Sequence, residues 1–230
     1  MTSATRVPDR IVPVASATRV DAWILPLDLP PGESRAVLNT AERAHAARLR
    51  VGGARWAASR AALRRVLGRY LGADPASLEY ETGARGKPRL RSPALDLRFS
   101  LAHSDDTALL AVRLGHDVGA DLERIRDDVD VAGIARTMFG PRERAELQAP
   151  GSAAPREAFF RAWTRREALA KSTGAGIAEP GAGGWTGHAV RELHGIPGFA
   201  AAVASEGADW TLALAANIEG RQPSPRAVTR

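Results

Sequence analysis

The chain has 230 residues, 44% of them hydrophobic, and a formal net charge of +6 at pH 7. This length and composition favour one large domain or two small ones with a buried core, and they exclude disorder for most of the chain. Because there is no cysteine, disulfide bonds, thiolate zinc sites and cysteine nucleophiles are excluded. The positive charge predicts a polyanionic partner, and charge alone leaves open nucleic acid, an anionic membrane, a phosphate-rich cofactor or an acidic protein.

No run of about 18 apolar residues occurs, so no segment is expected to span a membrane. The N-terminus lacks the continuous apolar stretch of a signal peptide, and we expect a cytoplasmic protein. Residues 1–18 and 220–230 are rich in Pro, Ser, Thr and Arg, which predicts mobile tails.

The first half of the chain moves from helical to strand patterns. A strand is expected over residues 20–27. Thr40 is predicted to cap a helix that ends near Arg50, and a second helix, over about 54–70, stops at Gly72. A hairpin and three strands follow, over residues 78–81 with 87–90, 98–101, 107–114 and 118–123.

The second half repeats this order. Helices are expected over about 131–138, 142–148 and 156–172, and strands over about 188–193, 199–204 and 210–216. The repetition predicts an α+β fold of two pseudo-symmetric halves, each with a small, mostly antiparallel sheet packed against helices. We assign the halves to residues 19–117 and 118–219, and expect the strand pair around 99–112 to correspond to that around 199–215.

Two carboxylates are predicted to lie side by side at the end of an apolar strand. Asp121 and Glu123 are two residues apart, so on a strand they point to the same face. Like charges that close are unfavourable unless a cation joins them, and oxygen ligands favour magnesium or manganese. The alternative is a polar strand end in solvent.

A glutamate and a lysine are predicted to share one face of a helix. Glu167 and Lys171 are four residues apart, and Phe160 and Thr164 precede them on the same stripe. The alternative is an ordinary surface ion pair. Two facts favour a functional role for this pair: Phe160 requires burial, and Lys171 is one of only two lysines among 32 basic residues.

Further candidates come from a turn, a strand end and the arginine-rich helices. Lys87 is the other lysine, and Pro88 after it keeps its backbone extended. His103 lies where a strand meets a loop. The arginines could clamp phosphates, although for most of them a solvated helix face is the simpler interpretation; they are Arg43, Arg48, Arg50, Arg55, Arg60 and Arg64.

The order and spacing of these motifs resembles a known family. Gly-Lys-Pro at 86–88, Phe-Ser-Leu-x-His-Ser at 99–104, Gly-x-Asp-Leu-Glu at 119–123 and Trp-x-x-Arg-Glu-Ala-x-x-Lys at 163–171 are similar to the 4′-phosphopantetheinyl transferases of the surfactin-synthetase type. The resemblance implies a single chain of two halves that acts as a monomer. It also implies a transferase that moves phosphopantetheine from coenzyme A to a serine of an acyl or peptidyl carrier protein and releases 3′,5′-ADP.

The resemblance also assigns roles to the candidate residues. Asp121, Glu123 and Glu167 would hold magnesium with the coenzyme A pyrophosphate. Glu167 would take the serine proton, directly or through a water, and Lys171 would contact the phosphate. The nucleotide would be bound by Lys87 with Pro88, His103, Arg48 and Arg55. Ala102, where the family usually has serine, removes one small phosphate contact.

Two other functions use some of the same residues. A metal-dependent nuclease also has carboxylates, a lysine and a basic surface, but usually places its glutamate and lysine two apart on a strand. A basic nucleic-acid-binding protein would leave Asp121, Glu123, Glu167 and Lys171 unexplained, and aromatic residues are only 5% of the chain. We therefore expect no nucleic-acid or membrane partner, and we assign the carrier contact to residues 138–154.

Overall fold

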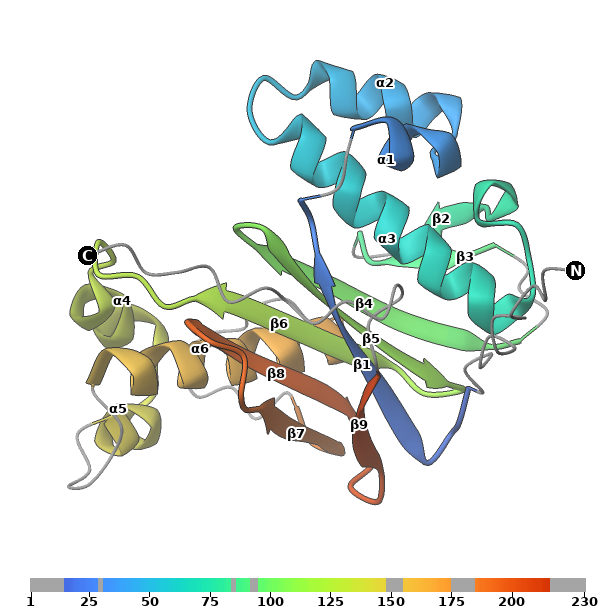
Figure 1. Ribbon diagram of the computed structural model, residues 1–230. Helices are drawn as coiled ribbons and strands as arrows, with labels where there is room; N and C mark the ends of the chain where they lie inside the picture. The colour runs from blue at the N-terminus through green and yellow to red at the C-terminus, as the bar shows by residue number, and fades with distance from the viewer. Residues whose placement is uncertain are drawn as a thin grey trace, which may run out of the picture.

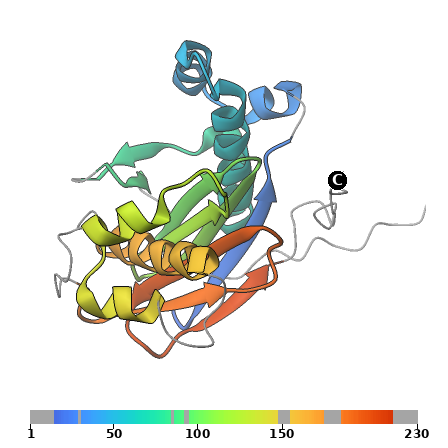
Figure 2. The ribbon, with the colours of Figure 1, turned by 90° about the vertical axis from the view of Figure 1, so that its left-hand side faces the viewer.

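The computed structural model describes residues 15–28, 31–83, 86–91, 95–147, 155–174 and 185–215. Within these ranges the two larger of three sheets lie between two groups of helices (Figures 1 and 2). The predicted tails therefore lie almost wholly outside the described residues. None of the described helices is long and apolar enough to cross a membrane.

The first sheet has four strands in the order β4-β5-β1-β9. Three of them pair antiparallel, whereas β9 runs parallel to β1. Side chains alternate between its two faces, as strand geometry requires. The strands are β1 (Arg19–Pro26), β4 (Leu97–Ser104), β5 (Thr107–Leu114) and β9 (Thr211–Ala215).

Helices α1 (Pro31–Val37), α2 (Thr40–Arg48) and α3 (Gly53–Leu71) form one group beside this sheet (Figure 1). α3 buries Leu63, Val66 and Leu67 against the sheet face that carries Trp23 and Leu110. A short 3₁₀ helix (Pro75–Ser77) then leads to the hairpin of β2 (Tyr80–Thr82) and β3 (Pro88–Leu90).

The second sheet is antiparallel and has the order β6-β8-β7, formed by β6 (Val118–Arg124), β7 (His188–Leu193) and β8 (Phe199–Glu206). One face shares a core with the first sheet, to which β6 contributes Val118, Ala120 and Leu122. The alternate residues Gly119 and Asp121 therefore face α6 (Pro155–Thr173). Helices α4 (Val131–Met138) and α5 (Pro141–Leu147) lie beside α6.

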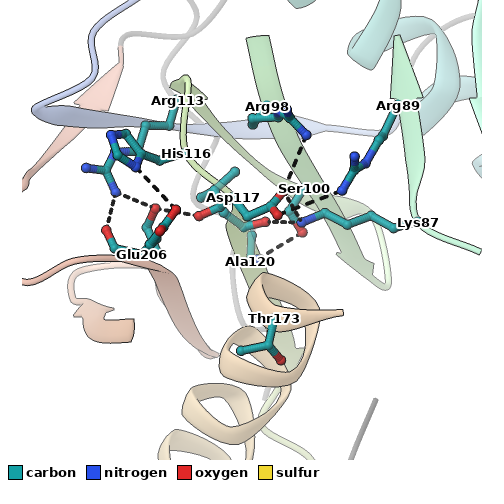
Figure 3. A network of polar contacts seen from close by, with 12 residues as sticks. Lys87, Arg89, Arg98, Ser100, Arg113, His116, Asp117, Ala120, Thr173 and Glu206 are labelled. Atoms are coloured by element: carbon teal, nitrogen blue, oxygen red, sulfur yellow. Dashed lines mark hydrogen bonds and ion pairs between the residues drawn. The ribbon is translucent and has the colours of Figure 1, made fainter. Parts of the chain in front are cut away.

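A polar network joins the two sheets where β5 passes into β6 (Figure 3). The guanidinium of Arg113 donates to Ser205 Oγ at 2.7 Å and to the Glu206 carbonyl at 2.6 Å. The Ser205 hydroxyl in turn donates to the carbonyl of Asp117 at 2.7 Å. Farther along, the hydroxyl oxygens of Ser100 and Ser104 accept from backbone amides of β6, so side chains of β4 replace a backbone ladder there.

The α+β class and most predicted elements are confirmed, with some corrections. Asn39, not Thr40, caps α2: its side chain accepts from the Glu42 amide, and the Glu42 side chain accepts in return. The seven-residue α1 was not predicted because so short a helix shows no apolar period. The expected second strand pair does not form, because β8 and β9 belong to different sheets.

Candidate active site

A cavity of about 480 Å³ lies between α3, the β2–β3 hairpin, β4 and α6. Segments far apart in the sequence therefore meet around one space. Its walls include six of the residues singled out from the sequence, namely Arg60, Lys87, Pro88, His103, Glu167 and Lys171.

Asp121 and Lys171 form an ion pair between β6 and α6. The ammonium of Lys171 donates to Asp121 Oδ1 at 2.6 Å. Asp121 is only 4% exposed, and its other oxygen, Oδ2, is buried without a hydrogen-bond partner among the described residues. Burial raises the pKa of the Asp121 carboxyl, against the lowering effect of Lys171. A buried carboxylate oxygen without a donor has an unused capacity to bind a cation.

Gly119 sets the distance between this strand and this helix. A Cβ atom at Gly119 would lie 2.0 Å from the carbonyl oxygen of Ala168 and 2.3 Å from the amide nitrogen of Ser172. Only a residue without a side chain therefore lets the backbones of β6 and α6 approach this closely. The approach brings Asp121, two residues along the strand, within reach of Lys171.

Glu123 and Glu167 flank this pair and are electrostatically coupled to it. The hydroxyl of Ser104 donates to Glu123 Oε2 at 3.1 Å. Burial raises the pKa of Glu123, and the charge of Asp121 adds to the effect. Burial also raises the pKa of Glu167, where Lys171 opposes the effect and the charges of Asp121 and Glu123 add to it. Three carboxylates thus act on one another around a single ammonium group.

His103 lines the cavity, and Arg55 is electrostatically coupled to it. Burial lowers the pKa of His103, and the positive charges of Arg55 and Lys171 add to the effect. Arg55 does not line this cavity but a second one of about 440 Å³, together with Arg35 and Arg43. Arg48, in contrast, lies exposed at the end of α2 and lines neither cavity.

Lys87 has a structural partner as well as a place in the cavity wall. Its ammonium donates to the carbonyl of Val118 at 2.8 Å and lies 3.7 Å from Asp117 Oδ1. Arg89 and Arg98 also point at Asp117, so three cations surround one carboxylate (Figure 3). Burial lowers the pKa of Lys87, against the raising effect of Asp117.

Comparison with known proteins gives the geometry a context. Residues 117–215 match the model of the 4′-phosphopantetheinyl transferase superfamily. The chain is 38% identical over 167 residues to the 4′-phosphopantetheinyl transferase HetI of Nostoc sp., a match that covers 70% of each protein. The chain belongs to the 4′-phosphopantetheinyl transferase superfamily.

Two further members of this superfamily match the chain less completely. A putative 4′-phosphopantetheinyl transferase of Synechocystis sp. is 32% identical over 164 residues, which are 67% of this chain and 65% of the relative. The 4′-phosphopantetheinyl transferase AcpT of Escherichia coli (strain K12) is 39% identical over 121 residues, 52% of this chain and 57% of the relative. The match to AcpT thus spans little more than half of either protein.

The carboxylates of this transferase fit a hard cation, although the described residues contain no ready-made group of three or more His, Asp or Glu side chains that could hold one. The donor set consists of oxygens, which magnesium prefers. The buried, unpartnered Oδ2 of Asp121 supplies one ligand position. Glu123 and Glu167 are only partly buried, so their side chains can turn toward that position.

Sequence reasoning missed or misread several residues of this region. Ser104 and Gly119 belong to the motifs, but no role was predicted for either. Ser104 donates a hydrogen bond to Glu123, and Gly119 allows the close approach of α6. A solvated helix face was expected for most of the arginines, but Arg64 is 0% exposed. Phe139 was assigned to the carrier contact, yet it is fully buried and stacks on Phe159. Residues 148–154 of that predicted contact lie outside the described residues.

Proposed function

We propose that the chain transfers the 4′-phosphopantetheine group of coenzyme A to a serine of an acyl or peptidyl carrier protein, with magnesium (or manganese), and releases 3′,5′-ADP. The observation that carries this proposal is the Asp121 carboxylate. It is buried, bonded to Lys171 through one oxygen, and without a donor at the other. Glu123 and Glu167 are electrostatically coupled to it, and Glu167 and Lys171 line the cavity.

In this reaction the serine oxygen forms a bond to the phosphorus that carries pantetheine. The bond between that phosphorus and the bridging oxygen breaks, and 3′,5′-ADP leaves with the electron pair. Asp121, Glu123 and Glu167 would hold a magnesium ion, which would neutralise charge on the phosphates. Lys171 places an ammonium beside the same phosphates and stabilises the negative charge of the leaving group.

Glu167 is our candidate for the group that takes the serine proton, directly or through a water. Its raised pKa lies closer to the operating pH than the pKa of an ordinary carboxylate, which makes Glu167 a stronger base. His103, Lys87 with Pro88, and Arg55 are our candidates for contacts with the nucleotide. Arg48 stays in this set as a prediction, and its exposed position would require the nucleotide to reach the end of α2.

We also propose the surfactin-synthetase subtype, in which residues 19–117 and 118–219 form two halves of a monomer. In support, the chain leaves the first sheet after β5 and starts the second at β6. The return of β9 to the first sheet ties the proposed halves together. The net charge of +6 would steer acidic carrier proteins and coenzyme A to a cytoplasmic enzyme with no nucleic-acid or membrane partner.

The nuclease alternative loses its geometric basis. Glu167 and Lys171 both lie on the helix α6, four residues apart, and not on a strand.

Intact-mass spectrometry of an apo carrier protein tests the proposed function. The purified protein, magnesium and coenzyme A should add one phosphopantetheine to the carrier. The gain should disappear with EDTA and with Glu167→Ala. Failure to modify any of several acyl and peptidyl carriers, by a folded protein, would contradict the proposal.

A further inference from the structure

Arg60 of α3 lines the same cavity as Lys87, His103 and Lys171, yet none of the motifs includes it. It lies five residues beyond Arg55, about 7.5 Å farther along the helix axis. With Trp56, Ser59 and Leu63 it forms the stripe of α3 that borders the cavity. A cation is thus built into the wall opposite α6.

The guanidinium of Arg60 is held on two sides. Its Nε donates to Glu42 Oε1 at 2.6 Å, and its carbon lies 3.9 Å from the centroid of the Tyr80 ring. Arg60 is 18% exposed, which is low for an arginine side chain. The plane of the group is therefore fixed before any ligand arrives, which reduces the entropy lost on binding.

These contacts leave donors available. Among the described residues no hydrogen bond engages Nη1 or Nη2 of Arg60, and neither atom is buried. Arg64, by comparison, donates to Glu42 and to the backbone carbonyls of Pro75 and Leu78. Two arginines thus share one carboxylate, so the cluster carries a net positive charge, and Arg60 is its member that borders the cavity.

We propose that Arg60 binds a phosphate group of the coenzyme A nucleotide through Nη1 and Nη2, with Glu42 and Tyr80 as its positioning residues. This inference rests on the proposed function, which makes coenzyme A the occupant of the cavity. Two guanidinium nitrogens in one plane match two phosphate oxygens. The phosphate is either the 3′-phosphate or the diphosphate, which share this chemistry.

Calorimetric titration of coenzyme A and dephospho-coenzyme A into wild type, Arg60→Ala and Arg60→Lys tests the proposal. Loss of a charge-assisted contact should weaken coenzyme A binding about 10- to 100-fold in Arg60→Ala, with an intermediate loss in Arg60→Lys. In the transfer assay KM for coenzyme A should rise while kcat changes little. If the loss is confined to coenzyme A, the 3′-phosphate is the partner; an equal loss for both ligands assigns the diphosphate.

Arg65→Ala is the matched control. Arg65 lies on the same helix, donates to the backbone carbonyl of Glu33, and does not line the cavity. The Arg65→Ala variant should bind coenzyme A with the affinity of wild type. The Arg60 variants should also show a weaker dependence of affinity on salt, because one cation–phosphate contact is gone.

Two results would overturn the inference. One is Arg60→Ala affinity within twofold of wild type, in a wild-type protein that binds coenzyme A and modifies a carrier. The other is a loss of affinity with unchanged salt dependence, which would mean that Arg60 acts only on the packing of the cavity wall. If wild type does not bind coenzyme A, the proposed function fails and the inference fails with it.

Discussion

Two buried carboxylates, one in each part of the molecule, are satisfied to different degrees. Glu42 is 8% exposed, and its two oxygens accept from Arg60, Arg64 and the amide of Asn39. Asp121 is 4% exposed, but Lys171 reaches only one of its oxygens. Burial alone would raise both pKa values; the donors around Glu42 bring its pKa below the ordinary value, whereas that of Asp121 stays raised.

The difference distinguishes a structural ion cluster from the proposed active site. A carboxylate with donors at both oxygens stabilises the fold and has little capacity for another ligand. A buried carboxylate with one oxygen left without a donor costs stability, and such a cost is typical of functional sites. We therefore expect substitutions of Glu42 to change stability first and substitutions of Asp121 to change activity first.

The largest effect is expected from Glu42→Ala. Removal of the carboxylate leaves the fully buried Arg64 and the nearby Arg60 without their counter-charge. Breaking a buried ion cluster by removing one partner costs about 3–5 kcal/mol. Chemical denaturation measures this loss, and kcat of the protein that remains folded should be close to wild type. A loss of stability below about 1 kcal/mol would contradict the structural role of Glu42.

Asp121→Asn should have the opposite profile. The amide oxygen can still accept from Lys171, and no charge has to be buried, so the free energy of unfolding should change by less than about 1 kcal/mol. The transfer rate should fall about 10²- to 10³-fold, because a proposed ligand of the metal loses its negative charge. Intact-mass kinetics on a carrier protein would check this, and a rate near that of wild type would contradict the assignment.

Gly119→Ala tests whether the close approach of β6 and α6 matters. The added methyl overlaps the backbone of α6, and overpacking of this kind costs about 1–3 kcal/mol. Activity should fall as well, because Asp121 and Lys171 move apart. Gly32→Ala is the control: its Cβ meets nothing within 4 Å, and thermal denaturation should show no loss of stability.

The smallest expected effect is on pH dependence. Since the folded-state pKa of Glu42 is lowered, its contribution to stability is full above the unfolded value of about 4.3 and is lost as pH falls through the lower folded value. Glu42→Gln should therefore lose less stability than wild type between neutral pH and this acid range. Glu79→Gln, which changes an exposed pair with Arg91, should follow the wild-type curve. Parallel curves for Glu42→Gln and wild type would contradict the prediction.

The sequence predicted the parts of this comparison that depend on local periodicity. Asp121 and Glu123 follow from strand alternation, and Glu167 and Lys171 from helical spacing, so their shared location could be expected. Glu42, Arg60 and Arg64 carry the same local signal as any charged helix surface. Only the packing of α2 against α3 shows that Arg64 is buried.

Pairing between strands far apart in the sequence could not be predicted either. Nothing local in residues 211–215 indicates that β9 joins β1 in parallel rather than continuing the second sheet. The role of Gly119 likewise depends on a helix about fifty residues later in the chain. Gly119 is visible in the motif, but the reason a glycine is required there, its closeness to the backbone of Ala168 and Ser172, is seen only in the structure.

Electron paramagnetic resonance of Mn²⁺ tests most directly whether Asp121, with its unpartnered oxygen, is a metal ligand as we propose. In the presence of coenzyme A, wild type and Glu79→Gln should bind the ion, and Asp121→Asn should lose most of this binding. Equal Mn²⁺ binding by Asp121→Asn and wild type would contradict the account.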